Sequence, residues 1–287
     1  MFDNSLFNAE VYFINSSFYQ NTSFFYSEFK GYTSFIESQF MKSVLFSDTS
    51  FDETFFNSVS FKGSTTFSSV HFLGSTSFRY SSFMDRVDYR NITFKDEVNF
   101  YGSTFYSFAS FHNANFGSKV SFQNSTFDST VSFLETKFSS KVDFSSATFK
   151  EEVNILDAIL PDTLILSNVK TVEEIDLTYM RLDSLKQVCI IDLYGTDINK
   201  IKFDYSRFYI LQHAAVYSKA HISHLYEQVL KMQKDKGFID SYEKADKEYR
   251  HFELTYQKPF PSKIWGEMSS FMQRYWWDYG YQKGRIF

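Results

Sequence analysis

Phenylalanine recurs through the first half of the chain with gaps that alternate between five and six residues. The series runs from Phe2 to Phe149, and Tyr89 takes the place of phenylalanine once. On both sides of Phe56 the gap is five, so one residue is missing from a single eleven-residue unit. This spacing fits neither the 3.6-residue period of a helix nor the two-residue period of a strand. The chain must therefore turn a corner every five or six residues.

A small or β-branched residue stands two positions before each aromatic ring, as Ser5 stands before Phe7 and Val142 before Phe144. In an extended chain, residues two apart point to the same face, so each unit sends one small and one large side chain inward. One coil alone cannot bury its rings, so we predict a solenoid whose coils stack them into ladders. The ladder positions that we single out are Phe7, Phe18, Phe29, Phe40, Phe51, Phe72, Phe83, Phe94, Phe105, Phe116, Phe127, Phe138 and Phe149.

The repeat resembles that of the pentapeptide-repeat proteins, whose unit has a small residue, a polar residue and then a central Leu or Phe. Ala114-Asn115-Phe116, Ser5-Leu6-Phe7 and Ala147-Thr148-Phe149 carry this pattern. The resemblance covers residues 2–208 and implies a mainly β fold, a right-handed quadrilateral β-helix with four repeats to a coil. The extra residue in alternate units predicts about 22 residues per coil, with a bulge at every second side or corner.

Leu and Ile replace Phe in the ladder after residue 149. Ile155, Leu160 and Leu166 keep the same rhythm, which slips over residues 183–192 and resumes in fives at Leu193. We therefore predict a β-helix over 1–208, with a Phe ladder over 2–149 and a Leu/Ile ladder over 155–208.

From Tyr209 the apolar residues are spaced three and four apart, which is typical of helices. Stop signals at Gly237 and Pro259 predict an antiparallel helical hairpin over 209–260. An aromatic amphipathic stretch follows over 261–287. Residues 1–208 hold 25 acidic and 17 basic side chains, a net charge of −8, whereas residues 209–287 hold 9 and 12, a net charge of +3. A basic end rich in Trp and Tyr suits a membrane–water interface, although these aromatics could equally pack on the end of the solenoid.

A subset of pentapeptide-repeat proteins is similar in this region too. In that subset a helical hairpin, a short aromatic helix and a Gly-Tyr-Gly-like turn precede transmembrane helices, some of which are similar to channel pores. The residues that resemble the hairpin motif are Tyr226, Leu230, Gly237, Ala245 and Tyr249. The residues expected at a membrane interface are Trp265, Trp276, Trp277, Tyr279, Gly280, Tyr281 and Arg285. One departure is Asp278, which stands where the first glycine of the turn is usual.

The sequence offers little for catalysis. It has no phosphate-binding glycine motif and no nucleophile elbow. The one cysteine, Cys189, excludes a disulfide framework or a multi-Cys zinc site and is predicted to be a buried thiol. His213, His221, His224 and Glu227 form the only ligand-like cluster, and no second helix completes a di-metal site. We therefore predict no enzyme activity, cofactor or metal. No run of apolar residues is long enough to span a bilayer, and no signal peptide is visible.

Two functions remain. The first is a rigid scaffold or sensor, the soluble part of a membrane-associated, channel-like bacterial protein at the cytoplasmic face. It would bind a protein partner or a second copy through the open N-terminal end of the solenoid and the C-terminal helices, and a membrane surface through its C-terminal segment. The alternative, from the same resemblance, is an acidic DNA mimic that inhibits a topoisomerase such as gyrase. A net charge of −8 on the rod is weak beside duplex DNA, which carries one charge per about 1.7 Å. Binding to nucleic acid is not expected.

Overall fold

The computed structural model describes residues 1–183, 188–212, 217–256, 267–268 and 270–271. By its internal contacts the chain divides into two compact units, Met1–Phe203 and Asp204–Phe287. Each unit is described by itself.

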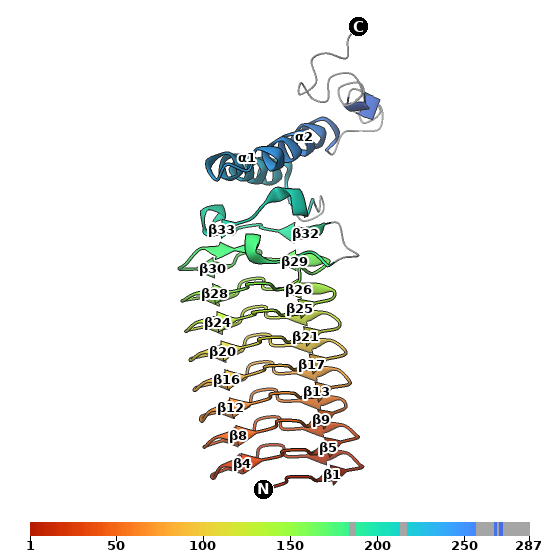
Figure 1. Ribbon diagram of the computed structural model, residues 1–287, viewed down its shortest axis with the longest axis vertical. Helices are drawn as coiled ribbons and strands as arrows, with labels where there is room; N and C mark the ends of the chain where they lie inside the picture. Colours follow the sequence, from red (N-terminus) through yellow and green to blue (C-terminus); the bar gives the residue numbers. More distant parts are fainter. Residues whose placement is uncertain (184–187, 213–216, 257–266, 269, 272–287) are drawn as a thin grey trace. The chain divides into compact units, whose positions relative to one another are not determined.

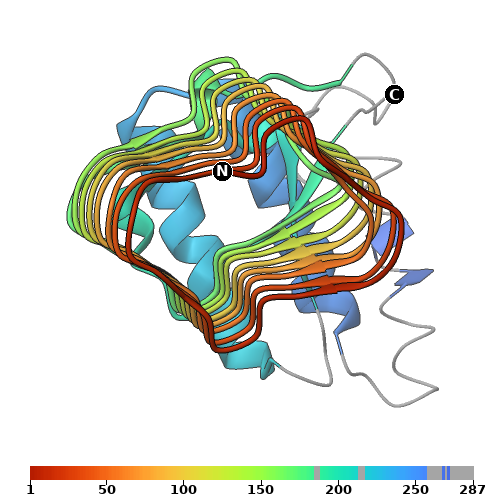
Figure 2. The same ribbon diagram turned by 90° about the horizontal axis from the view of Figure 1, so that it is seen from below.

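The first unit is a parallel β-solenoid of about nine coils (Figure 1). Each complete coil of the Phe region contributes one short strand to each of four sheets, and the view along the axis shows a four-sided outline (Figure 2). The predicted β-helix is therefore confirmed.

The four sheets, here A to D in the order in which the chain visits them, are built from strands of two to four residues. Sheet A contains β1 (Leu6–Phe7), β5 (Glu28–Phe29), β9 (Ser50–Phe51), β13 (His71–Phe72), β17 (Thr93–Phe94), β21 (Asn115–Phe116) and β25 (Lys137–Phe138). Sheet B contains, within this unit, β2 (Val11–Tyr12), β6 (Thr33–Ser34), β10 (Thr54–Phe55), β14 (Thr76–Ser77), β18 (Val98–Asn99), β22 (Val120–Ser121), β26 (Lys141–Asp143), β29 (Thr163–Ile165) and β32 (Cys189–Asp192). Sheet C contains β3 (Ser17–Phe18), β7 (Gln39–Phe40), β11 (Ser60–Phe61), β15 (Ser82–Phe83), β19 (Thr104–Phe105), β23 (Thr126–Phe127), β27 (Thr148–Phe149) and β30 (Lys170–Thr171). Sheet D contains β4 (Thr22–Ser23), β8 (Val44–Leu45), β12 (Thr65–Thr66), β16 (Val87–Asp88), β20 (Ala109–Ser110), β24 (Val131–Ser132) and β28 (Val153–Asn154).

The register between coils explains the rhythm of the sequence. Phe94 pairs with Phe116, and Val98 pairs with Val120, so equivalent residues are 22 apart. Four corners per coil then require an average of five and a half residues per side. The 22-residue coil that the alternating gaps predict is confirmed.

The corners are of two alternating kinds. A short corner places two residues between a ring and the next small inward residue, and the second of them has a positive φ, as Asn113 (φ 53°) and Asn124 (φ 54°) do. A long corner places three residues there. The positive-φ residues recur mostly every eleven positions, and many of them are Asn or Asp, which tolerate this left-handed conformation better than other non-glycine residues. The extra residue of every second unit is therefore accommodated at a corner.

The single missing residue lies in one long corner. Between the strands β9 and β10 only Asp52 and Glu53 form the connection. Phe29 pairs with Phe51 at an offset of 22, whereas Thr33 pairs with Thr54 at an offset of 21. Inward and outward positions are kept on both sides, because the corner alone absorbs the deletion.

The core of the solenoid is a set of parallel ring stacks. Phe78, Phe100 and Phe122 lie in one stack, with centroids 4.8 and 4.9 Å apart and planes within 5° of parallel. Neighbouring rings within a coil are tilted, as Phe100 and Phe105 are at 51°. From Phe24 to Phe133 the ladder rings are at most 2% exposed. Burying each ring contributes on the order of 2–3 kcal/mol, so the rings dominate the stability of the rod.

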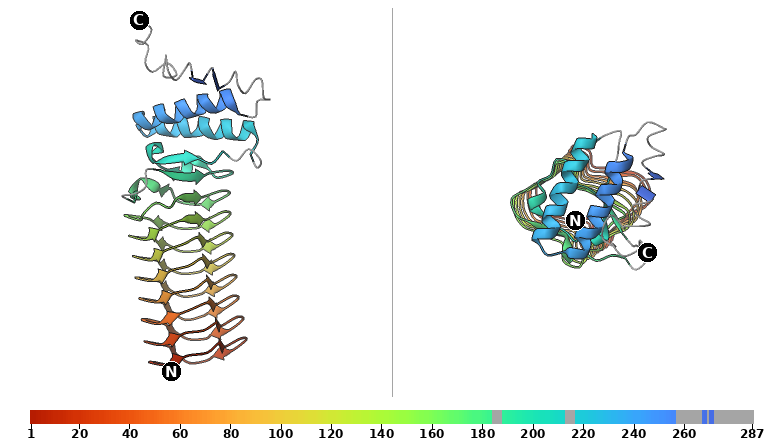
Figure 3. Two further views of the ribbon diagram at one scale, coloured as in Figure 1. Left: turned by 90° about the vertical axis from the view of Figure 1, so that its right-hand side faces the viewer. Right: turned by 90° about the horizontal axis from the view of Figure 1, so that it is seen from above.

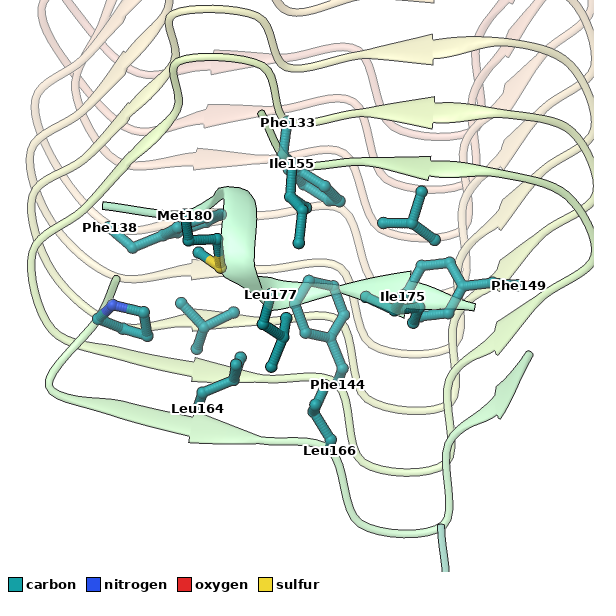
Figure 4. A pocket seen from close by; sticks show the side chains of 13 residues that line it. Phe133, Phe138, Phe144, Phe149, Ile155, Leu164, Leu166, Ile175, Leu177 and Met180 are labelled. Atoms are coloured by element: carbon teal, nitrogen blue, oxygen red, sulfur yellow. The ribbon is translucent and has the colours of Figure 1, made fainter. Parts of the chain in front are cut away.

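The ladder loosens where aliphatic residues replace phenylalanine. A small apolar cavity of about 30 Å³ lies among side chains that include Phe133, Phe144, Ile155, Leu164 and Met180 (Figure 4). Being apolar and of water size, such a cavity stays dry. Aliphatic side chains fill the cross-section less completely than stacked rings do.

The last coils of the unit are irregular. Thr163 of β29 pairs with Ile190 of β32 at an offset of 27, so this coil is five residues longer than the standard coil. It includes the predicted slip over 183–192, after which Leu193 is again buried. The remaining elements are the strands β31 (Ile175–Asp176) and β33 (Ile201–Lys202), which pair with each other, and the 3-10 helices η1 (Leu177–Tyr179) and η2 (Ile198–Lys200).

The second unit contains the predicted helical hairpin (Figure 3). It begins with the 3-10 helix η3 (Tyr205–Arg207) and the strand β34 (Phe208–Ile210), followed by α1 (Lys219–Asp235) and α2 (Ile239–Thr255). Ser218 caps α1 by accepting the backbone N–H of His221. Gly237 (φ 77°) ends α1 in the left-handed conformation that glycine permits. Within the described ranges, no helix has both the length and the apolar composition needed to cross a bilayer.

Candidate functional site

A groove runs along the outer surface of sheet B. It encloses about 490 Å³ and extends over the strands β10, β14, β18, β22 and β26. Its floor consists of the outward residues that alternate with the inward ladder, such as Ser77, Asn99 and Ser121. The complete lining is Phe55, Asn57, Ser75, Thr76, Ser77, Arg79, Glu97, Val98, Asn99, Lys119, Val120, Ser121, Gln123, Lys141 and Asp143.

Charges in the groove are largely paired with each other. Lys119 Nζ lies 2.8 Å from Glu97 Oε1, and Lys141 Nζ lies 2.9 Å from Asp143 Oδ2. The hydrogen bond to the Glu97 carboxylate raises the pKa of Lys119, so this ammonium stays charged at neutral pH. The guanidinium of Arg79 lies 5.2 Å from the centre of the Tyr101 ring, in a cation–π contact.

Hydrogen bonds hold the amide side chains of the groove in place. Asn99 Oδ1 accepts the backbone N–H of Tyr101 at 2.8 Å, and Asn57 Oδ1 accepts that of Arg79 at 3.1 Å. Gln123 Nε2 donates to Asp143 Oδ2 at 3.0 Å. These contacts fix the amides of Asn57 and Asn99 with their oxygens engaged, so their NH₂ groups are the donors that remain for a ligand.

One end of the groove is aromatic. Phe55 stacks on Tyr32 at 5.2 Å, and Tyr32 in turn lies 5.6 Å from Tyr12. Tyr12 is 56% exposed, whereas Phe55 and Tyr32 are half-buried. These three rings belong to the outside of the solenoid and take no part in the inner ladder. Sequence reasoning did not single out the groove, although columns of outward residues 22 apart, such as Asn57, Arg79, Tyr101 and Gln123, were readable once the coil length was known.

The hairpin-motif residues lie where the two helices meet. The rings of Tyr226 and Tyr249 stack at 5.4 Å, and Ala245 and Tyr226 are fully buried. Gly237 forms the turn between the helices, and Leu230 on α1 is half-buried. The structure therefore gives these five residues positions in the packing of the hairpin.

A partly buried polar cluster at the hairpin was not predicted from the sequence. The Tyr205 hydroxyl donates to Glu248 Oε2 at 2.6 Å, and Lys244 Nζ lies 3.9 Å from the same carboxylate and 4.3 Å from the centre of the Tyr209 ring. Lys244 Nζ also donates to three backbone carbonyls of residues 205, 206 and 208, at 3.0–3.2 Å. The cluster fixes η3 and β34 against α2. It was missed because its hydrogen bonds between η3 or β34 and α2 join residues 36 to 43 apart, which follow no period.

Burial perturbs the ionisation of this cluster. It raises the pKa of Glu248 and lowers the pKa of Lys244, and in each case the opposite charge of the partner acts the other way. Burial, followed by the nearby Glu248 carboxylate, raises the pKa of Tyr226 to about 12. Burial likewise raises the pKa of Tyr205 well above its usual value. The tyrosines therefore remain neutral hydrogen-bond donors at physiological pH.

The first coil of the solenoid is less buried than those that follow. Phe2, Phe7, Phe13 and Phe18 are half-buried, whereas Phe24 is fully buried. Large apolar or aromatic side chains are also exposed on this coil, namely Leu6, Tyr12, Ile14 and Tyr19.

The other sequence candidates are dispersed. Cys189 is fully buried. His224 Nδ1 lies 3.9 Å from Glu227 Oε2 on the exposed side of α1, while His221 contacts Ser218. Among the described residues, no group of three His, Cys, Asp or Glu side chains is placed to hold a metal ion. His213 and the seven membrane-interface candidates, Trp265, Trp276, Trp277, Tyr279, Gly280, Tyr281 and Arg285, lie outside the described residues.

Comparison with known proteins identifies the repeat. The family model described as pentapeptide repeats (9 copies) matches residues 56–104 and, in a second overlapping match, residues 89–136. No curated protein matches the chain. A solved structure of QnrB1, described as a plasmid-mediated fluoroquinolone resistance protein, aligns over 77% of this chain and 94% of its own, with 13% identity and a TM-score of 0.17. At that TM-score the two structures cannot be compared coil by coil.

Proposed function

Because the chain is a pentapeptide-repeat protein, we propose that it is a non-enzymatic scaffold or sensor. In this proposal the rod is a rigid spacer that binds partners through its outer surface. The segment that follows the helical hairpin attaches it to the cytoplasmic face of a membrane, in a channel-like bacterial protein.

The close packing of side chains inside the rod supports this proposal. The inward side chains of the coils are occupied with one another, as Phe78, Phe100 and Phe122 are in their parallel stack. The interior of the Phe region therefore leaves no room for a substrate. Any partner must bind the outward-facing side chains or the two ends of the solenoid. Interaction surfaces on such repeats characteristically lie on the outside of the stacked units.

Membrane attachment rests on the sequence of the C-terminal segment. Its test is flotation of the full chain with vesicles of phosphatidylcholine, alone and with phosphatidylglycerol. We expect flotation with both, stronger with the anionic lipid because residues 209–287 carry a net charge of +3. The double substitution Trp276→Ala and Trp277→Ala should reduce flotation several-fold. Tyr106→Ala, at an exposed ring of the rod, is the matched control. If the wild-type chain stays at the bottom of the gradient with both lipids, attachment is wrong.

The DNA-mimic alternative is less well supported. Acidic residues on the rod are interspersed with basic ones that pair with them, as Asp128 pairs with Lys150 and Glu97 with Lys119. Such pairs break up the continuous negative surface that a mimic of duplex DNA requires. A supercoiling assay with gyrase distinguishes the two functions. We expect no inhibition at micromolar concentrations of the chain, and potent inhibition would favour the mimic.

Binding of a protein partner, or of a second copy, is proposed at the first coil and at the helices. The half-buried rings of Phe7 and Phe18 and the exposed Tyr19 are what support it at the first coil. Sedimentation equilibrium of the full chain over a hundredfold concentration range tests self-association. A mass that stays monomeric throughout would leave only the partner-binding form of this proposal.

A further inference from the structure

We propose that the groove over sheet B binds an extended, uncharged polysaccharide chain that lies parallel to the axis of the rod. This inference rests on the proposed function, because it names the partner of an outer surface of the scaffold. The groove is the part of the rod where aromatic faces, fixed amides and paired charges occur together. Ligand sites typically combine apolar contact surface with a few positioned polar groups.

The period of the groove favours this ligand. Equivalent side chains repeat once per coil, with a rise of about 4.8 Å between paired strands. The groove therefore offers one set of contacts per coil over about 19 Å, from β10 to β26. One monosaccharide of an extended pyranose chain advances by about the rise of one coil, so successive sugars lie over successive coils, with alternate sugars turned over in a β-1,4-linked chain. In an extended peptide, side chains on the same face repeat about every 6.6–6.8 Å. This spacing differs from the rise of one coil, so the peptide side chains no longer match equivalent positions after two coils.

The aromatic end supplies the faces that sugars stack on. Phe55 lines the groove, and its contact with Tyr32 continues the aromatic surface beyond the polar floor. The C–H groups on one side of a pyranose ring are attracted to the negative face of an aromatic ring. Phe55 replaces a serine found at the same position one coil away on each side, Ser34 and Ser77. The ring is therefore an addition to the outer surface that the β-helix itself does not require.

The polar floor matches hydroxyl groups. With their oxygens held by backbone N–H groups, Asn57 and Asn99 present NH₂ donors that suit sugar hydroxyls as acceptors. Ser121 adds a hydroxyl, which can both donate and accept. Sugar hydroxyls likewise act in both roles, so they are complementary to the amides and hydroxyls of the floor.

The charges of the groove argue against an ionic polymer. Lys119 and Lys141 are already paired with Glu97 and Asp143, and Arg79 lies against Tyr101. An acidic ligand would be repelled by both carboxylates, and a basic ligand by all three cations. The lining of three cations and two anions leaves a net charge of only +1. A neutral ligand requires none of these pairs to separate.

The test is titration calorimetry of the full chain with three neutral probes, cellohexaose, chitohexaose and mannohexaose, and two anionic probes, a heparin hexasaccharide and hexaglutamate. We expect at least one neutral hexasaccharide to bind, with an affinity that changes little between 50 and 300 mM salt because no ions are released. The variants Phe55→Ser and Asn99→Ser each restore the residue of a neighbouring coil, so they should fold normally. Each should weaken binding at least tenfold.

A matched control distinguishes the groove from the rest of the surface. Leu45 is the outward, half-buried residue of β8 in sheet D, with Ser23 and Thr66 as its neighbours one coil away. Leu45→Ser makes the same kind of change as Phe55→Ser on a different face and should leave the affinity unchanged. Equal thermal midpoints of the three variants establish that all are folded.

Three results would overturn the inference. They are no binding of any neutral hexasaccharide at millimolar concentration, binding that Phe55→Ser and Asn99→Ser leave intact, and binding of the anionic probes alone. The last result would mean that Arg79, Lys119 and Lys141 act as an anion site. The flotation experiment is independent of these results. A chain that floats with vesicles but binds no glycan would contradict this inference and leave the proposed function supported.

Discussion

Ser125 donates its hydroxyl hydrogen to the backbone carbonyl of Phe100 in the neighbouring coil, at 2.7 Å. Both residues are fully buried. The same contact recurs eleven residues on, where Thr136 donates to the carbonyl of Phe111, also at 2.7 Å. A buried hydroxyl without a partner costs about 1–3 kcal/mol, and this bond removes that cost. Polar residues are thereby accepted at inward positions of an otherwise aromatic core, and they also tie successive coils together.

Replacing this hydroxyl tests its contribution. Alanine already occupies equivalent inward positions at Ala114 and Ala147, so Ser125→Ala should fit without strain. We expect the free energy of unfolding in urea to fall by about 1 kcal/mol, the usual value of one hydrogen bond. Ser118→Ala, at a half-buried position on the outer surface, is the control and should change it by less than about 0.5 kcal/mol. Equal effects of the two substitutions would contradict the role of the buried contact.

Because the short corners contain a residue with a positive φ, an Asn→Val substitution should affect thermal stability differently at a corner and in a strand. Asn124 has φ 54°, whereas Asn115 lies in the strand β21, and both side chains are exposed. A β-branched residue is strained in the left-handed region by about 1–2 kcal/mol but is favoured in strands. Asn124→Val should therefore lower the midpoint of thermal unfolding by several degrees, while Asn115→Val should leave it unchanged or raise it. The reverse order would show that the corner does not require its conformation.

The apolar cavity predicts a stabilising substitution. Ile155 follows Phe133 by one coil and lines the cavity. Ile155→Phe would extend the ring stack and fill the space, and we expect the free energy of unfolding to rise by about 0.5–1 kcal/mol. Val131→Phe, which places a second ring at a small inward position, should instead lower it by about 1–3 kcal/mol. Chemical denaturation of both variants measures this. Destabilisation by Ile155→Phe would mean that the neighbouring aliphatic side chains cannot move aside.

The half-buried carboxylate of Glu248 predicts a pH effect on the helical unit. Because burial raises its pKa above the ordinary 4.5, the folded state holds this proton to a higher pH than the unfolded state does. The contribution of Glu248 to stability therefore falls as the pH rises from 4.5 through the raised pKa. Glu248→Gln keeps an acceptor for the Tyr205 hydroxyl and removes the titration.

Thermal unfolding followed by helical circular dichroism between pH 4 and pH 8 measures this effect. The stability of the variant relative to the wild type should increase with pH over that window. A constant difference would mean that the pKa of Glu248 is the same in both states.

The repetitive part of the fold could be predicted from the sequence because every coil repeats the same arrangement of corners and inward side chains. The gaps between rings report the corner lengths directly, and the short gap after Phe51 corresponds to the shortened corner at Asp52–Glu53. In the Phe region each ring contacts its equivalent 22 residues away, or 21 across the shortened corner, so one period describes most of the core.

Other features follow no such period. The contact between Tyr205 and Glu248 joins residues 43 apart, and the enlarged coil that ends at β32 departs from the repeat. The groove over sheet B depends on side chains from five strands meeting on one outer face. Its separate columns are periodic, but their meeting in one concave surface depends on how each coil bends at its corners.

The corner at Asp52–Glu53 also has a practical consequence. A residue is absent there, yet the strands on both sides pair as they do elsewhere. Corners are thus points at which chain length can vary without disturbing the neighbouring layers. An engineer seeking a place for a tag, a fluorophore loop or a grafted epitope would choose such a corner, and a whole coil excised between two equivalent corners would shorten the rod by one layer.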